Sequence, residues 1–578
     1  MHSDLFALAS FALFTAAVAF FSYRITRRAG DTGARGYFLA SGGLSSWFIA
    51  GSMLLTYLSL EALVGLNGDS YAHNLSSLSW EVTAVVAIVA LALFFLPRYL
   101  RGGFTTLPQF LEERYDPATR RAVSGLFIIG YVLVVNPSGL YLGAITFNQI
   151  FSVQTLLGLS YPATITALAL SAGVIGALYA VLGGLRGVAV SDTIYGAAIL
   201  VAGLIIPIAG LVAIGHGSAL AGLRDLIAHA PEKLNAVGGP RDTVPFGTVF
   251  TGMVFANLFY WCTNQSIVQR TMAARNLAEG QKGVLLMGFL KLTMPLLSLL
   301  PGIIAYRAYA SHPLLRPDLA YPRLVADLLP FWAKGFFSAA LFGTMLSHFK
   351  AVLNSAATLF TLDFYKPRHP RASDGELVLV GKWASMAIAV ASLAIAPLLV
   401  YAPDGIYALL RRWTGFFNVP IIVIMLVGFF DRSVGALPAK IVLFTHVVVY
   451  TLFVIILGVD QRLGIHFIHL MGILGVAEVA LMLALRKRFA RPTPYKAILR
   501  DHCDITPWRW ARSAGTLLLA LLVTVYLTLS PVGIARTGGA SAGYLPGLAT
   551  LWTIALALAW LFARRPAFAG APEQRRPG

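Results

Sequence analysis

The stretch SMLLTYLSLEALVG, residues 52–65, places Thr56, Tyr57, Ser59 and Glu61 in the middle of a long apolar run. An apolar run of about 20 residues is long enough to cross a lipid bilayer as a helix. A polar cluster at mid-membrane has two interpretations: a continuous helix with a buried polar stripe, or a helix that unwinds there. In an unwound helix the freed carbonyl oxygens coordinate a cation, and the half-helix ends face a ligand.

A second polar cluster, ANLFYWCTNQ at residues 256–265, follows about 200 residues later. Each cluster opens a block of five apolar runs, at residues 44–215 and 246–430. Two interrupted segments in corresponding positions of two halves are the sequence sign of an inverted-repeat transporter. The pairing therefore favours unwound helices over continuous ones.

The composition of the whole chain agrees with a membrane protein. Of its 578 residues 57% are hydrophobic and only 12% are charged, whereas a soluble globular chain carries about 25% charged residues. This excludes a soluble enzyme, a disordered chain and a fibrous protein. The two cysteines, Cys262 and Cys503, exclude a disulfide framework.

Apolar runs of membrane-spanning length recur along the whole chain, and we count fifteen of them. About 30 of the 44 Lys and Arg residues fall in loops on one side of this arrangement, and such an excess marks the cytoplasmic side. We therefore expect a multi-pass protein of the cell membrane (bacterial inner-membrane type) with its N-terminus outside and its C-terminus in the cytoplasm. The runs lie near residues 4–23, 44–65, 79–97, 122–151, 161–183, 188–215, 246–264, 279–306, 331–362, 377–401, 405–430, 437–458, 463–485, 513–532 and 543–563.

Ionisable residues inside these runs are candidates for function, because each costs a few kcal/mol at the centre of a bilayer even on lenient scales. A histidine stands beside them at position 348. The ionisable residues are Glu61, Glu81, Asp192, Lys291, Lys350, Arg411 and Arg412.

Several stretches carry a family resemblance and occur in family order over about residues 36–510. The longest are LLTYLSLEALVGLNG at 54–68, FTTLPQFLEERY at 104–115 and WCTNQSIVQR at 261–270. Shorter matches lie at 183–185, 191–192, 281–283, 289–292, 353–355, 362–366 and 505–508. In these residues the chain resembles the solute:sodium symporter family, especially its bacterial sodium/sugar branch.

The resemblance implies an all-α integral membrane fold of about 15 transmembrane helices. It is of the LeuT type: a five-plus-five inverted repeat whose first and sixth helices are broken, with additional flanking helices. We expect an N-terminal extra helix and cytoplasmic loop at 1–35, the first repeat at 36–215, an extracellular loop at 216–245, the second repeat at 246–430, and C-terminal extra helices with a cytoplasmic tail at 431–578.

The resemblance also implies a sodium site. Its expected ligands are hard oxygen atoms, which suit an alkali cation. His348 stands where the family has a further hydroxyl, and imidazole suits softer metals better than sodium. Either His348 blocks the ion or it rotates away to a carbonyl, while Lys350 adds a positive charge nearby. The expected ligands are the backbone oxygens of Leu55 and Leu58, the carbonyl of Thr344 and the hydroxyl of Ser347, with His348 beside them.

Asp192 matches a family residue on the path by which sodium leaves toward the cytoplasm; its alternative role is an ion pair with Arg186. The resemblance therefore favours sodium-coupled symport with alternating access. Proton-coupled or uncoupled transport by the same fold remains the alternative, because of His348.

The solute site departs from the sugar-binding pattern of the family. Tyr57 and Ala62 stand where sugar-binding relatives have an Asn and a Gln, and Arg411 stands where they have a Gln. A guanidinium favours a carboxylate-bearing substrate, unless Arg411 neutralises a buried glutamate. We expect a small organic solute, sugar or sugar-acid-like. The expected substrate-binding residues are Tyr57, Ser59, Glu61, Glu81, Asn136, Asn257, Tyr260, Asn264, Lys291 and Arg411.

Two other classes of function compete with transport. The departures at Tyr57, Ala62 and His348 are also compatible with a sensor or regulatory membrane protein on a transporter scaffold. A membrane enzyme is disfavoured, since no motif supplies a nucleophile, a metal site or a donor-binding loop. We expect no catalytic residues, no organic cofactor and no nucleic-acid partner; the expected partners are sodium, the solute and the lipid bilayer.

Overall fold

The computed structural model describes residues 2–27, 43–104, 106–314, 316–401, 406–496, 503–537 and 539–564. For residues 2–8, 19, 22–23, 25–27, 179–193, 331, 406 and 408 within these ranges only the backbone is described. In the described ranges the regular structure is helical, apart from two isolated β-bridges that join Leu44 with Ala274 and Val434 with Ala490.

The first half of the chain forms a leading helix followed by the predicted first repeat. Its elements are α1 (His2–Arg27), α3 (Ser46–Tyr57), η2 (Glu61–Gly65), α4 (Leu66–Ala72), η3 (Leu75–Ser77), α5 (Leu78–Val82), α6 (Ala84–Ala90), η4 (Leu91–Phe95), α7 (Leu96–Gly102), α8 (Leu107–Arg114), α9 (Pro117–Gly130), η5 (Tyr131–Val135), α10 (Asn136–Phe151), α11 (Val153–Leu157) and α12 (Tyr161–Ile214).

A loop region with three short helices, α13 (Ala219–His229), η6 (Pro231–Leu234) and η7 (Phe246–Phe250), leads into the predicted second repeat. Its elements are α14 (Gly252–Leu258), η8 (Phe259–Thr263), α15 (Gln265–Met272), α16 (Leu277–Thr293), α17 (Pro295–Ser298), α18 (Leu300–Ala308), η9 (Pro317–Leu319), α19 (Ala320–Leu328), α20 (Phe331–Leu359), η10 (Phe360–Tyr365), α21 (Lys366–Arg368), α22 (Asp374–Ile395), η11 (Ala396–Tyr401) and α23 (Ile406–Phe430).

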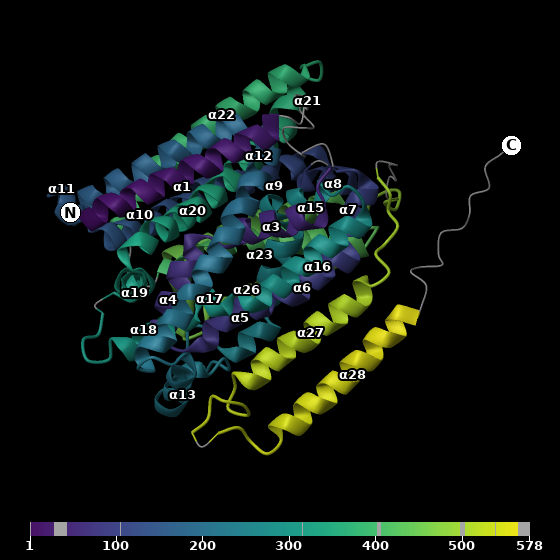
Figure 1. The fold of residues 1–578 in the computed structure, drawn as a ribbon. Coiled ribbons are helices and arrows are strands. Elements are labelled where there is room, and N and C mark those ends of the chain that lie inside the picture. The colour runs from purple at the N-terminus through teal and green to yellow at the C-terminus, as the bar shows by residue number, and fades with distance from the viewer. Residues whose placement is uncertain are drawn as a thin grey trace.

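The remaining helices flank this bundle. In Figure 1, α27 and α28 lie along its outside, whereas α3, α15 and α23 lie near its centre. The flanking elements are α24 (Ala436–Val449), η12 (Tyr450–Ile456), α25 (Val459–Leu463), α26 (Phe467–Arg486), α27 (Ala511–Thr528) and α28 (Tyr544–Arg564).

The outer surface of the bundle is apolar, as a lipid-facing surface must be. Large side chains such as Phe444, Trp383 and Val201 are 72%, 69% and 69% exposed. Within the described residues twelve helices are long and apolar enough to span a membrane, or thirteen if one bent pair counts as a span. The expected count of about fifteen is therefore not confirmed, because the segments near 4–23 and 246–264 do not meet this criterion among the described residues.

The helix α12 contains two apolar spans, Tyr161–Leu178 and Ile194–Ile214. Both spans pack on α20: Gly176 lies against Phe349 in the first span, and Tyr195 lies against Gly343 in the second. Both contacts fall within two turns of α20, so the two spans pack on the same part of that helix. The two crossings that the sequence predicts here agree with the two spans.

The first predicted break is present between α3 and α4. The N–H of Ser59 donates to the carbonyl of Tyr57 (2.7 Å), and the N–H of Ala62 donates to the carbonyl of Ser59 (3.0 Å). The helical ladder is thereby interrupted, and the two half-helices meet at an angle of 58°.

The second break follows η8, where Asn264 adopts an extended conformation with φ −71° and ψ 120°. Its side chain accepts a hydrogen bond from the N–H of Ser266 and so caps the half-helix α15. Both helix breaks that the polar clusters predicted are therefore confirmed. They face each other in the centre of the bundle, where α15 and η8 lie close to α3.

Candidate functional site

Glu81 on α5 lies at the centre of a buried polar cluster. Lys291 on α16 donates from Nζ to Oε2 of Glu81 at 2.8 Å, and both side chains are fully buried. The hydroxyl of Tyr57, at the end of α3, donates to the other carboxylate oxygen. The Nζ atom also lies 3.1 Å from the centre of the Tyr57 ring, which adds a cation–π contact. The carboxylate is thus neutralised by a lysine inside the bundle.

Arg411 on α23 faces Glu61 across the cluster. Its Nη2 atom lies 3.9 Å from Oε1 of Glu61, at the outer limit of an ion pair. The guanidinium carbon lies 4.8 Å from the ring centre of Tyr407 and 5.1 Å from that of Trp80. Among the described residues Nε of Arg411 has no hydrogen-bond partner. The predicted pairing of Arg411 with a buried glutamate therefore takes place with Glu61, loosely, because Glu81 is occupied by Lys291.

A small cavity lies beside these two pairs, with a volume of about 20 Å³. This is room for about one water molecule. A sugar-sized solute can enter only after the surrounding side chains move. The solute site is therefore closed in this structure. The cavity is lined by Tyr57, Trp80, Ala256, Asn257, Tyr260, Trp261, Arg411, Thr414, Asn418 and Met471.

Four of the predicted substrate-binding residues line the cavity: Tyr57, Asn257, Tyr260 and Arg411. Glu61, Glu81 and Lys291 do not line the cavity themselves but contact two residues that do. Glu61 faces Arg411, and both Glu81 and Lys291 contact Tyr57. The structure brings these seven residues together from seven elements that are spread between residues 46 and 430.

The other three predicted residues do not line the cavity. Ser59 accepts a weak hydrogen bond from the N–H of Ala62 at 3.4 Å, within the helix break. Asn264 accepts from the hydroxyl of Tyr131 at 2.7 Å while it caps α15. Asn136 donates to Ser392 at 3.4 Å. In this conformation these residues hold the helix breaks and helix contacts rather than the solute.

The break in α3 frees the carbonyl oxygens that the sodium-site prediction uses. In a regular helix the N–H of Ser59 would donate to Leu55 and that of Ala62 to Leu58. Both N–H groups donate elsewhere, to Tyr57 and Ser59 respectively. The carbonyls of Leu55 and Leu58 therefore lack their usual helical donors, which leaves hard oxygen atoms available to a cation.

His348 on α20 is turned toward the same break. Its Nδ1 atom lies 2.9 Å from the carbonyl oxygen of Thr56, which only accepts, so Nδ1 carries the hydrogen. Of the two expected arrangements of His348, the structure has the one in which the ring binds a carbonyl. Its Nε2 atom is buried and has no partner among the described residues.

Thr344 and Ser347 lie four residues and one residue before His348, so the three share one face of α20. Thr344 and Ser347 are fully buried, and Lys350 is 2% exposed. The side chain of Asp192 and that of Arg186 lie outside the described residues. Within the described part of the chain no group of three or more His, Cys, Asp or Glu side chains is placed to hold a metal ion.

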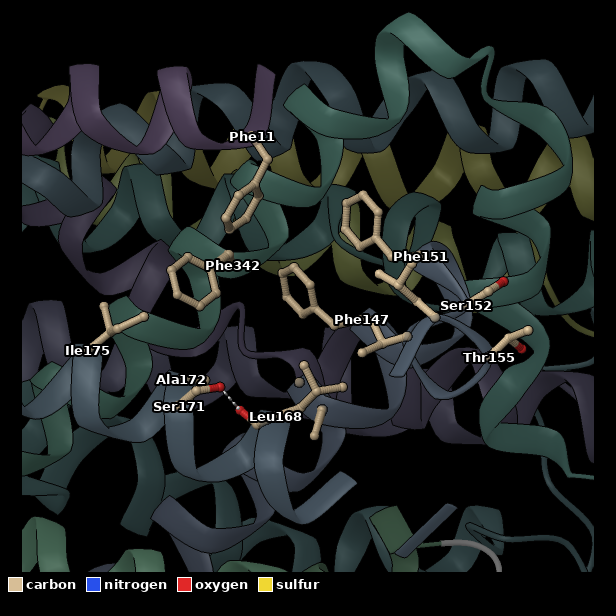
Figure 2. Close-up of a pocket in the computed structure, with 14 residues that line it drawn as sticks. Phe11, Phe147, Phe151, Ser152, Thr155, Leu168, Ser171, Ala172, Ile175 and Phe342 are labelled. Atoms are coloured by element: carbon tan, nitrogen blue, oxygen red, sulfur yellow. Dashed lines mark hydrogen bonds between the residues drawn. The ribbon is translucent and has the colours of Figure 1, made fainter. Parts of the chain in front are cut away.

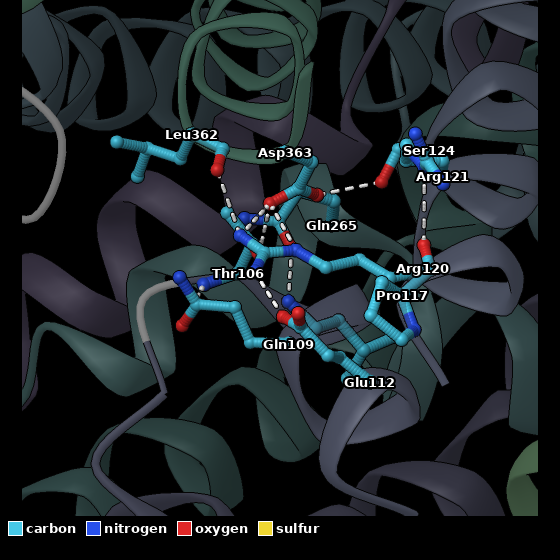
Figure 3. A network of polar contacts seen from close by, with 11 residues as sticks. Thr106, Gln109, Glu112, Pro117, Arg120, Arg121, Ser124, Gln265, Leu362 and Asp363 are labelled. Atoms are coloured by element: carbon cyan, nitrogen blue, oxygen red, sulfur yellow. Dashed lines mark hydrogen bonds and ion pairs between the residues drawn. The ribbon is translucent and has the colours of Figure 1, made fainter. Parts of the chain in front are cut away.

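A second polar network, drawn in Figure 3, lies where α8, α9 and η10 meet. Asp363 in η10 accepts hydrogen bonds from Ser124 (2.6 Å), Thr106 (3.0 Å) and Nε of Arg120 (2.9 Å). Arg120 on α9 also pairs with Glu112 on α8. The network thereby ties the α8–α9 corner of the first half to the end of α20 in the second half. Thr106, Glu112 and Asp363 lie in stretches that carry the family resemblance, but no role was predicted for them, and Arg120 and Ser124 lie outside those stretches.

Two further buried pairs were not predicted from the sequence. His446 on α24 contacts Glu478 on α26, and Arg412 on α23 pairs with Asp460 on α25. His446 and Glu478 lie inside the apolar runs 437–458 and 463–485. An inspection of those two runs for ionisable residues would have found both.

A larger pocket is apolar and lies elsewhere, among α1, α10, α11, α12 and α20 (Figure 2). Its volume is about 590 Å³, and Phe11, Phe147, Phe151 and Phe342 contribute aromatic rings to its wall. The hydroxyl of Ser171 donates to the backbone at 3.0 Å and is not offered to a ligand. The pocket suits hydrocarbon rather than a polar solute, so the polar cavity is the candidate solute site.

Comparisons with known proteins agree with this geometry. The sequence model of the sodium:solute symporter family matches residues 37–442. The symporter YidK of Escherichia coli (strain K12), itself uncharacterised, is 41% identical over 91% of this chain and 91% of its own length. The sodium/glucose cotransporter of Vibrio parahaemolyticus is 30% identical over 69% of this chain and 75% of its own length.

Among solved structures, a Na⁺-coupled sialic acid symporter in a substrate-bound outward-open state has the same fold. Its TM-score is 0.70 at 19% identity, and the match covers 85% of this chain and 99% of that one. The LeuT-type fold that the sequence predicted is therefore confirmed, and the protein is a transporter rather than an enzyme. The chain belongs to the sodium:solute symporter family.

Proposed function

We propose that this protein carries a sugar-like polyol into the cell together with sodium. The supporting observation is the charge-balanced, aromatic-lined cavity between the two broken helices. Two cations and two carboxylates stand around it as the pairs Glu81–Lys291 and Glu61–Arg411. A site without net charge suits a neutral solute, whose hydroxyl groups both donate and accept hydrogen bonds.

The lining chemistry agrees with a polyol. The rings of Tyr57, Trp80, Tyr260 and Trp261 offer apolar faces to the C–H surface of a sugar, and the amides of Asn257 and Asn418 offer hydrogen bonds. Relatives named as sodium/glucose and sodium/myo-inositol cotransporters support the same class. A sugar acid is the second candidate, because Nε of Arg411 has no partner among the described residues.

Sodium is the proposed co-transported ion. The freed carbonyls of Leu55 and Leu58, together with Thr344 and Ser347 on α20, supply oxygen atoms of the kind an alkali cation prefers. His348 is bonded to Thr56, so its ring is held by the helix break. The proposed exit path past Asp192 continues from this site toward the cytoplasm.

Alternating access is the proposed mechanism. Because the cavity holds only about one water molecule, both solute entry and release require a wall to move. Tyr260 lines the cavity at the break of the sixth repeat helix, and its ring lies edge-on to that of Tyr57 at 6.2 Å between centres. We propose Tyr260 as the side chain that closes over the solute. The division into repeats at 36–215 and 246–430 gives the two halves that move.

Uptake into proteoliposomes tests this proposal. Purified protein is reconstituted, and uptake of radiolabelled myo-inositol, glucose and glucuronate is measured with an inward sodium gradient. Uptake of a neutral solute that collapses when potassium replaces sodium supports the proposal. Uptake that persists without sodium and fails with a proton ionophore contradicts sodium coupling. Binding of a solute without counterflow would support the sensor alternative instead.

A further inference from the structure

His446 and Glu478 form a buried pair that the transport cycle proposed above does not use. The two side chains are 0% and 9% exposed. They lie near the midpoints of two apolar spans, Ala436–Ile456 and Phe467–Arg486. Neither residue lines the solute cavity. Ionisable groups at mid-membrane depth are costly, so their presence calls for a physical role.

The contacts of the ring fix the number of protons that the pair holds. Nε2 of His446 lies 3.1 Å from the carbonyl oxygen of Gly415, which only accepts, so Nε2 carries a hydrogen. Nδ1 contacts a carboxyl oxygen of Glu478, and two acceptors hold each other only through a proton between them. The pair therefore holds two protons, one on Nε2 facing Gly415 and one shared between Nδ1 and Glu478. It has no net charge. The other oxygen of Glu478 has no partner among the described residues.

The neighbouring charges are already matched, so none is left to compensate a change in the pair. The ring of His446 stacks on Tyr450 at 5.3 Å, and the hydroxyl of Tyr450 donates to the carbonyl of Arg412. The segments α14 and η7, which also pack on α26, contain no ionisable residue. The other charged groups on the packed elements are in the pairs Arg412–Asp460, Arg411–Glu61, Lys440–Asp116, Arg486–Asp431 and Arg120–Asp363, or have exposed side chains, as Arg121 on α9 and Arg462 on α25 do. The N-terminal histidines of α26 are His466 and His469.

The pair lies directly behind the wall of the solute cavity. Gly415, whose carbonyl His446 binds, follows Thr414, which lines the cavity, and Met471 on α26 lines it as well. The helices approach so closely that a Cβ atom at Gly415 would lie 2.2 Å from the hydroxyl oxygen of Tyr450. The pair thus joins α24 and α26 to the part of α23 that forms the cavity wall.

We propose that His446 and Glu478 form a proton-binding site within the membrane, separate from the solute cavity. While the shared proton is bound, the pair is neutral and fastens α23, α24 and α26 together. Release of this proton at high pH leaves one uncompensated negative charge and two acceptors facing each other. The contact between the helices then loosens, so stability is present at low pH and is lost as the pH rises.

Thermal unfolding of the purified full-length protein in detergent micelles tests the site without any solute. The Tm is measured from pH 5 to pH 9 for wild type, His446→Gln, Glu478→Gln and the double variant. The double variant keeps a neutral amide–amide hydrogen bond but has no titratable proton. We expect the wild-type Tm to fall relative to that of the double variant by roughly 1–2 °C per pH unit from about pH 6.5, where a free histidine titrates, up to the pH at which the pair releases its proton, and to level off above it. His469→Gln, on the same helix but outside the pair, serves as the control and should follow wild type.

Parallel Tm curves of wild type and the double variant across this range would overturn the proposal. Misfolding of a single variant does not decide the matter, because the comparison rests on the difference between wild type and the double variant. The readout requires no transported solute, so failure of the uptake proposal leaves this test intact.

Discussion

At the scale of single residues, the site is governed by how its charges are paired. Glu81 has a close partner in Lys291, whereas Glu61 and Arg411 remain 3.9 Å apart. A close buried pair is strongly destabilised when one partner is removed, because the other charge is left alone. A loose pair beside a cavity is free to exchange its partner for a ligand. These two pairs therefore predict different consequences of mutation.

Lys291→Met should destabilise the protein by about 3–5 kcal/mol, because it leaves the carboxylate of Glu81 buried without a counter-charge. The double variant Lys291→Met with Glu81→Gln should recover most of this loss, since no charge remains. Thermal unfolding of both variants in micelles measures the difference. Equal destabilisation by the single and double variants would mean that the pair contributes through packing alone.

Arg411→Gln should abolish uptake of a neutral polyol by leaving Glu61 uncompensated beside the cavity. The double variant Arg411→Gln with Glu61→Gln should restore that uptake to within about tenfold of wild type, a difference of about 1.4 kcal/mol. The measurement is the initial rate of myo-inositol uptake in proteoliposomes. Loss confined to glucuronate in the double variant would instead assign Arg411 to a substrate carboxylate.

His348→Ser should lower the sodium concentration needed for half-maximal uptake by about tenfold. The substitution removes the imidazole from Thr56 and supplies a hydroxyl of the kind that the family has at this place. His348→Ala, which removes the ring without adding a ligand, is the matched control and should show a smaller effect. An unchanged sodium dependence in the serine variant would mean that position 348 does not face the ion.

At the scale of elements, the two broken helices and the network at Asp363 have different roles. The breaks expose backbone and place the solute site, whereas the network holds the α8–α9 corner against η10 at one end of the bundle. Asp363 is fully buried and accepts hydrogen bonds from three side chains, two hydroxyl groups and its charge partner Arg120. The α8–α9 corner must separate from η10 if that end of the bundle is to open.

Asp363→Asn should open that end more often, because an amide nitrogen replaces one of the accepting oxygens and Arg120 keeps only Glu112 as a charge partner. The native thiol of Cys262 reports the opening, since it is fully buried beside the second break. We expect its alkylation by a small maleimide, in a Cys503→Ser background, to become about tenfold faster. The exposed Glu376→Gln serves as the control, and an unchanged rate in Asp363→Asn would contradict a closing role for the network.

At the scale of the whole molecule, the apolar composition, the paired breaks and the family motifs predicted the fold, and the structure confirms it. The polar cluster predicted the helix break, and the family resemblance implied that the carbonyls of Leu55 and Leu58 are freed there. The partners of the charges did not follow, because Glu81 and Lys291 are 210 residues apart and only three-dimensional packing brings them together. His446 and Glu478 were missed for a simpler reason: the runs that contain them were counted as spans and not inspected for charge.

The predicted topology belongs to this scale as well. A fluorescent protein fused after residue 578 should fluoresce and a periplasmic reporter there should be inactive, because the excess of basic loops marks the cytoplasmic side. Reporters inserted in the loop between α12 and η7, near residue 240, should give the opposite result. If the same reporter is active both at residue 240 and at residue 578, the two positions lie on the same side of the membrane. This result would contradict the expected number of crossings between them.

The small volume of the cavity has a consequence for how tightly a solute binds. If the closed arrangement is the dominant population, only a fraction of molecules is competent to accept a solute at any moment. The apparent dissociation constant is then the intrinsic one divided by that fraction. Any change that enlarges the cavity, such as a smaller residue in place of Met471, should therefore tighten apparent binding without adding a single contact to the solute.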